Sequence, residues 1–126
     1  MKNLLLSVSI CILSSVSVFA QGHDYTLSSS QEAKCTELTR SMVNELRLNE
    51  IGYIKLKALN RERMALEEAA KESLKDDLAA QSIKLQEIGS DYDQKLTAML
   101  DASQLQAYAA YKRKSTINYI AVSEEK

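Results

Sequence analysis

Apolar residues recur every three or four positions along most of the chain, which is the spacing of helices that bury one face. In the first such segment the apolar positions are Cys35, Leu38, Met42, Val43 and Leu46. A serine cluster, Ser28–Ser30, precedes them. Ser28 paired with Gln31, or Ser29 paired with Glu32, would form a capping box. The pattern therefore predicts a first helix that begins at this cluster.

A second helix is expected from Asn49 to about Ser73, because the Asn49 side chain can accept hydrogen bonds from the free amides of the next turn. At about 100° per residue, one stripe of this helix holds Gly52, Leu56, Leu59, Leu66, Ala70 and Leu74. A break is expected within residues 71–77, where Asp76 or Asp77 would cap the next helix.

The third helix is expected to carry its apolar face on Leu78, Leu85, Ile88, Tyr92, Leu96 and Met99. Gly89 lies inside this helix and costs about 1 kcal/mol relative to Ala, which predicts the close approach of a neighbouring backbone. Asp101 is placed to cap a fourth helix, in which Leu105, Tyr108 and Ala109 would face inward.

These segments predict an all-α fold, in which the second and third helices form an elongated antiparallel hairpin and two shorter helices brace it. The helical domain is expected over residues 29–120, with a flexible lead-in at 21–28 and a frayed tail at 121–126. The composition agrees, because 126 residues without Pro and with three Gly are too poor in turn formers for an all-β fold. A net charge of −1 does not favour nucleic-acid binding.

Residues 1–20 have the pattern of a cleaved signal peptide, with Lys2 followed by an apolar run and Val18-Phe19-Ala20 before the expected cleavage site. An uncleaved membrane anchor is the alternative, but interleaved Ser and the short run disfavour it. The protein is therefore expected to be periplasmic or secreted, with no membrane span after cleavage. Cys35 would then be the only cysteine, either pairing between chains or packing as a small buried hydrophobe, and the helical pattern favours burial.

Two segments that begin 52 residues apart, Leu48-Asn49-Glu50-Ile51-Gly52 and Leu100-Asp101-Ala102-Ser103-Gln104, each place Leu before a capping residue at a helix start. The pair resembles the doubled L-T-x-x-Q pattern of the Spy/CpxP-like periplasmic proteins. Asn49 and Asp101 stand at the two Thr positions, Gly52 stands at the first Gln position, and Gln104 keeps the last letter.

This resemblance implies an exported, helical, cradle-shaped and often dimeric protein that binds unfolded or stressed proteins without ATP. Other members of that family repress an envelope-stress sensor kinase or associate with zinc, so the resemblance does not select one activity.

Every aromatic residue after position 20 is a tyrosine, whose apolar ring and polar tip suit a half-exposed surface that accepts varied partners. The candidate residues for binding a client or partner are Tyr53, Leu56, Lys57, Arg61, Met64, Tyr108 and Tyr111. Ordinary packing at the edge of the core is the alternative for Tyr53, and a solvated charged face is the alternative for Lys57 and Arg61.

Catalytic and cofactor chemistry is poorly supplied, because no nucleophile–base arrangement or Gly-rich phosphate loop is present, and no cofactor is predicted. Cleavage after Ala20 would make His23 the third residue, where an amine, two amides and imidazole can bind Cu(II) or Ni(II). An uninvolved His23 is the simpler interpretation. We therefore expect a non-enzyme: an ATP-independent chaperone or envelope-stress protein, or alternatively a helical module that pairs with a fixed partner or sequesters metal.

Overall fold

The computed structural model describes the backbone of residues 25–124 and the side chains of residues 25–115. This part of the chain forms four α-helices and no strand: α1 (Ser29–Leu46), α2 (Glu50–Ser73), α3 (Leu78–Ala98) and α4 (Ala102–Glu124). The predicted all-α fold is confirmed. The predicted signal peptide and His23 lie outside the described residues.

Two helices begin with a capping box, in which two side chains satisfy each other's backbone amides. At α1, the Gln31 amide donates to the Ser28 hydroxyl at 3.3 Å, and the Ser28 amide donates to the Gln31 side chain at 3.1 Å. At α4, the Gln104 amide donates to Asp101 Oδ1 at 2.8 Å, and the Asp101 amide donates to Gln104 Oε1 at 3.0 Å. Both predicted starts are therefore confirmed.

The other two helices begin at single caps, as predicted. Asn49 Oδ1 accepts from the Gly52 amide at 2.9 Å, and Asp77 Oδ1 accepts from the Ala80 amide at 3.0 Å. Between α1 and α2, Arg47 adopts the left-handed conformation, with φ 53°, which ends α1 and turns the chain.

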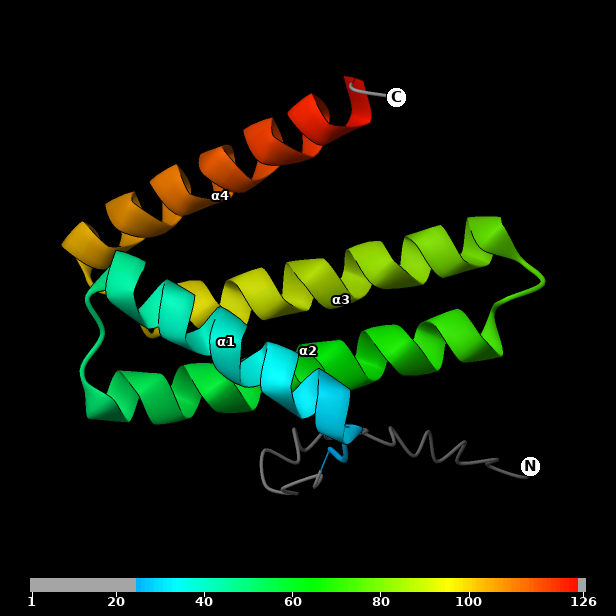
Figure 1. Cartoon of the computed structure of the whole chain (residues 1–126), viewed down its shortest axis with the longest axis horizontal. Coiled ribbons are helices and arrows are strands. Elements are labelled where there is room, and N and C mark those ends of the chain that lie inside the picture. The colour runs from blue at the N-terminus through cyan, green and yellow to red at the C-terminus, as the bar shows by residue number, and fades with distance from the viewer. Residues whose placement is uncertain (1–24, 125–126) are drawn as a thin grey trace, which may run out of the picture.

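The helices α2 and α3 lie side by side as an antiparallel hairpin, which confirms that part of the predicted architecture (Figure 1). Helix α1 crosses the hairpin and packs against α2, and α4 packs chiefly against α1 (Figure 1). The core lies where the four helices meet, and consists of Met42, Leu46, Leu56, Tyr92, Leu96, Leu100 and Tyr108.

Two expectations about the helices are wrong. Helix α4 is not a short brace: its 23 residues exceed the 21 of α3, and it continues past residue 120 to Glu124. Gly89 does not mark the close approach of a backbone, because a Cβ added there would meet no atom within 4 Å. Gly52 is the crowded glycine, since its Cβ would lie 2.9 Å from Leu48 Cβ.

Within the described residues, no helix combines the length and the apolar character that a membrane span requires.

Candidate binding groove

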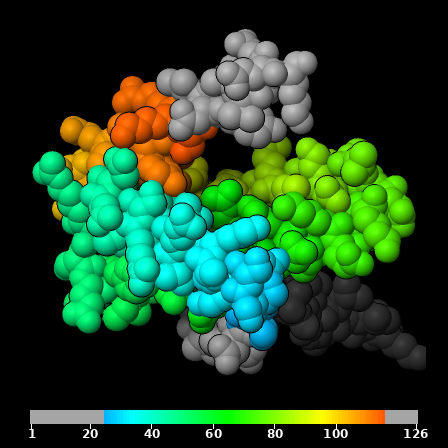
Figure 2. All heavy atoms as spheres, viewed as in Figure 1, coloured from blue at the N-terminus to red at the C-terminus, as the bar shows by residue number. Residues whose placement is uncertain are grey.

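An open groove of about 740 Å³ lies between the four helices. Its volume falls in the range of ligand-binding pockets, about 300–1,000 Å³. Figure 2 shows the surface hollowed between α4, in orange, and α3, in yellow-green. Each helix contributes to the lining, and the larger apolar side chains are Leu38, Met42, Met64, Tyr92, Tyr108 and Tyr111.

A chain of buried hydrogen bonds joins three helices, and two of its members, Asn60 and Tyr92, line the groove. The Tyr92 hydroxyl on α3 donates to Asn60 Oδ1 on α2 at 2.6 Å, and Asn60 Nδ2 donates to Thr39 Oγ1 on α1 at 3.0 Å. The Thr39 hydroxyl in turn donates to the Cys35 carbonyl at 2.7 Å. Burial raises the pKa of Tyr92, so this phenol stays protonated and remains a donor.

On one wall, Asp93 of α3 receives two hydrogen bonds from α4. The Tyr108 hydroxyl donates to Asp93 Oδ1 at 2.5 Å, and Lys112 Nζ donates to Asp93 Oδ2 at 3.0 Å. Burial by itself would raise the pKa of Asp93, but these two donors outweigh it and lower that pKa. Burial, followed by the hydrogen bond to this carboxylate, raises the pKa of Tyr108.

On the α2 side, the groove is lined by an ion pair within that helix. Arg63 Nε donates to Glu67 Oε1 at 2.7 Å, and the Arg63 guanidinium lies 4.9 Å from the centre of the Tyr92 ring. A cation over an aromatic face is attracted by the ring quadrupole. Arg63 therefore links Glu67 to the buried Tyr92 ring.

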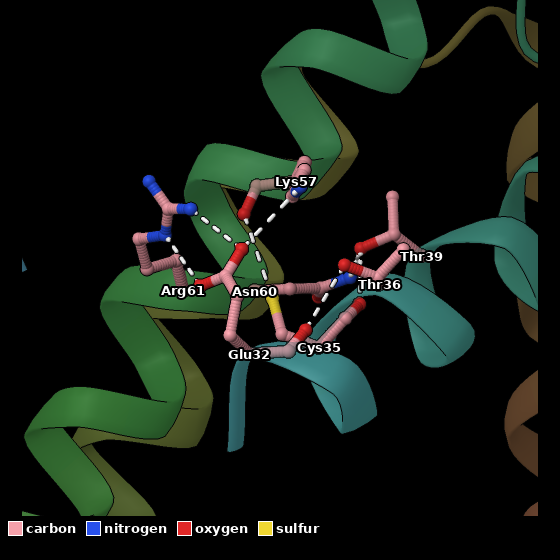
Figure 3. Close-up of polar contacts among 7 residues, drawn as sticks. All are labelled: Glu32, Cys35, Thr36, Thr39, Lys57, Asn60 and Arg61. Atoms are coloured by element: carbon pink, nitrogen blue, oxygen red, sulfur yellow. Dashed lines mark hydrogen bonds and ion pairs between the residues drawn. The ribbon is translucent and has the colours of Figure 1, made fainter. Parts of the chain in front are cut away.

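Outside the groove, a polar joint fixes the crossing of α1 over α2 (Figure 3). Arg61 donates from Nη2 to Glu32 Oε1 at 2.6 Å and from Nε to Glu32 Oε2 at 3.2 Å, and Lys57 Nζ lies 3.4 Å from Glu32 Oε1. The hydrogen bonds from Arg61 are the main cause that lowers the pKa of Glu32. Beside them the Cys35 thiol donates to the Lys57 carbonyl at 3.9 Å.

The structure places the predicted binding residues in different parts of the fold. Met64, Tyr108 and Tyr111 line the groove, and of these three only Tyr108 takes part in the hydrogen bonds described above. Tyr53 is half-buried and lies on the other side of the place where α1 crosses α2, at Lys57–Arg61. Tyr53 and Met64 are eleven positions apart, which corresponds to about 16 Å along the helix, so these two side chains do not form one patch.

Two of the predicted residues need correction as surface residues. Leu56 is 0% exposed and belongs to the core, so it presents no area to a partner. The ring of Tyr108 is buried at 4% exposure, so its contribution is to hold the wall rather than to offer a broad apolar face. Lys57 and Arg61 are engaged with Glu32, which makes them part of the α1–α2 joint.

None of the motif residues lines the groove. Asn49, Asp101 and Gln104 cap as predicted, whereas Leu48 packs against the core cluster and Leu100 is part of it.

Sequence reasoning missed two polar residues of the buried hydrogen-bond chain, Thr39 and Asn60. Each follows a buried residue by four positions, Cys35 and Leu56 respectively, so helical periodicity places them on the inward faces. Sequence reasoning also missed Asp93, whose partners on α4 lie 15 and 19 positions further along the chain.

Within the described residues, no group of three or more His, Cys, Asp or Glu side chains could hold a metal ion. His23, for which copper or nickel binding is the alternative to an uninvolved side chain, lies outside them. Comparison of the chain with protein-family models, with curated proteins and with solved structures finds no match.

Proposed function

We propose that this protein is an exported, ATP-independent chaperone-like protein that holds segments of unfolded proteins in the groove between its helices. The observation that carries the proposal is the open groove of about 740 Å³ with Leu38, Met64 and Tyr111 on its walls. Methionine and tyrosine adapt to differently shaped apolar partners, which suits the binding of many sequences. The signal-like residues 1–20 and the resemblance of the two Leu-cap segments to Spy/CpxP-like proteins support export and a role in envelope stress.

Charged side chains around the apolar walls would limit how tightly a segment is held. Arg63, Glu67, Asp93 and Lys112 all line the groove, and each is paired with a neighbouring side chain. A bound apolar segment would therefore contact paired charges at the edges of the groove, which favours reversible capture over permanent association.

A second candidate function is pairing with a fixed partner or a second copy through the outer face of α2. Ile51 and Ile54, three residues apart at the start of α2, are 64% and 60% exposed. Residues at this spacing share one helix face, so they would form the contact.

Two matched variants on α2 separate the candidates. Met64→Glu places a carboxylate in the groove, and Ile54→Glu places the same charge on the outer face of the same helix. The assay is light scattering by reduced lysozyme as it aggregates, with the protein at one- to five-fold molar ratios. The proposal predicts that the unaltered protein suppresses aggregation, that Met64→Glu loses most of this effect, and that Ile54→Glu retains it.

Absence of suppression by the unaltered protein at five-fold excess would refute the proposed function. Suppression that depends on Ile54 and not on Met64 would move the binding surface to the outer face of α2. Sedimentation velocity of the same two variants tests the second candidate, which predicts that Ile54→Glu alone shifts a dimer to a monomer.

A further inference from the structure

The geometry points to a latch at Asp93 that sets the position of α4 and thereby the width of the groove. The latch would regulate the proposed binding site, and this role rests on the proposed function. Its structural part, the attachment of α4, is tested separately.

Helix α4 forms one side of the groove through Tyr111, Lys112 and Ser115, yet it packs chiefly against α1 rather than α3. Figure 1 shows α4 diverging from α3 beyond the short connection between them. A helix attached in this way can pivot about that connection, and a pivot would widen or narrow the groove.

Asp93 bridges the diverging helices close to this pivot. Its two carboxylate oxygens each take a bond from α4, one from Tyr108 and one from Lys112. The Lys112 ion pair is half-exposed, and such pairs contribute little by themselves. The Tyr108 hydroxyl is the stronger tie, because its residue is buried and loss of the carboxylate would leave a buried donor without this acceptor.

Further along α4 a weaker attachment joins it to α1. Lys114 Nζ lies 3.3 Å from Glu45 Oε1, and both side chains are largely exposed. If Asp93 releases Tyr108 and Lys112, α4 remains tethered to α1 while its distance from α3 changes.

Hydrogen exchange measured by mass spectrometry tests the latch, with Asp93→Ala compared with Asp91→Ala. Asp91 is an exposed acid on the same helix that bonds only Lys95 among the described side chains, and Lys95 keeps a second bond, to Glu62 Oε1 at 2.7 Å. Loss of hydrogen bonds to a charged group corresponds to about ten-fold or greater acceleration of local exchange. We expect this acceleration in residues 105–112 of α4 for Asp93→Ala, with α1 and α2 unchanged, and no acceleration for Asp91→Ala.

Equal acceleration in all four helices would show that Asp93 stabilises the whole fold, and no acceleration would show that it does not hold α4. Either result overturns the latch. If Asp93→Ala does not fold, Tyr108→Phe carries the test, because it keeps the buried ring and removes only the hydroxyl.

Suppression of reduced-lysozyme aggregation by the same variants separates the effect of Asp93 on the groove from the proposed function itself. If Asp93 controls the width of the groove, Asp93→Ala should change the molar ratio of protein to lysozyme that halves aggregation by at least about two-fold. Asp91→Ala should match the unaltered protein. Faster exchange in α4 with unchanged suppression would overturn the gating. Absence of suppression by the unaltered protein would refute the proposed function and leave the exchange result valid.

Discussion

Removal of the Tyr92 hydroxyl tests the buried hydrogen-bond chain under the groove. In Tyr92→Phe, Asn60 Oδ1 loses the donor that lies 2.6 Å away, although Asn60 keeps its bond to Thr39. Asn60 is 1% exposed, so no bulk water replaces the lost donor. An unsatisfied buried polar group costs about 1–3 kcal/mol, and because only one bond is lost we expect the free energy of unfolding to fall by about 1–2 kcal/mol.

The reverse change, Asn60→Ala, removes the acceptor and leaves a small cavity. The Tyr92 hydroxyl would keep only the Met42 sulfur at 3.7 Å, a weak acceptor. We expect a loss of about 2–4 kcal/mol from the unsatisfied donor and the cavity together. In the double variant neither partner is left unsatisfied, so its loss should be smaller than the sum of the single losses by about 1–2 kcal/mol.

Urea denaturation followed by circular dichroism at 222 nm measures these losses, provided that the slope of the transition stays constant. Tyr53→Phe is the control, because the half-buried Tyr53 hydroxyl bonds no side chain in the described part of the chain. It should change stability by less than about 0.5 kcal/mol. A coupling near zero between Tyr92 and Asn60, or an equal loss in the control, would refute the assigned chain.

Three further outcomes follow from the structure. Gly89→Ala should raise the free energy of unfolding by about 0.5–1 kcal/mol in urea denaturation, because its Cβ meets open space, whereas Gly52→Ala should lower it because its Cβ meets Leu48. The Cys35 thiol, which is 0% exposed and whose pKa burial raises, should react with a thiol reagent only at the rate of local opening; rapid labelling and a covalent dimer would contradict this. Glu32 and Asp93 have pKa values lowered in the folded state, so their stabilising contribution is present above the unfolded pKa of about 4 and is lost as pH falls through the lower folded values. Urea midpoints that fall between pH 5 and pH 3 check this, and unchanged midpoints would count against it.

Local features of the fold were predictable because the residues that decide them lie close together in the sequence. The Ser28–Gln31 and Asp101–Gln104 boxes, and the caps at Asn49 and Asp77, follow from side chains that bond amides three residues away. The hairpin follows from two long amphipathic segments joined by a short break.

The groove was not predictable in the same way, because it depends on contacts between distant residues. Tyr92 and Asn60 are 32 positions apart, and Lys114 and Glu45 are 69 positions apart. The hydrophobic pattern of α1 identifies its buried face but not the angle at which it crosses α2. The crossing places Glu32 of α1 against Lys57 and Arg61, which lie between Tyr53 and Met64 on α2, so the predicted binding residues do not form one surface.

Gly89 shows a different limit of sequence reasoning. A glycine inside a helix signals either a close neighbour or an open site, and its cost in helix propensity is the same in both cases. Only the surrounding structure distinguishes them, and here Gly89 lines the open groove.

Binding of unfolded segments in the groove is tested by a nuclear magnetic resonance titration of the protein, labelled at its methionine methyl groups, with reduced lysozyme. Met64 lines the groove, and Met99 packs against the core outside it. If the groove holds unfolded segments, the Met64 methyl signal shifts or broadens in proportion to the lysozyme added while the Met99 signal stays in place. A Met64 signal that does not change while lysozyme is demonstrably bound would show that unfolded segments bind outside the groove.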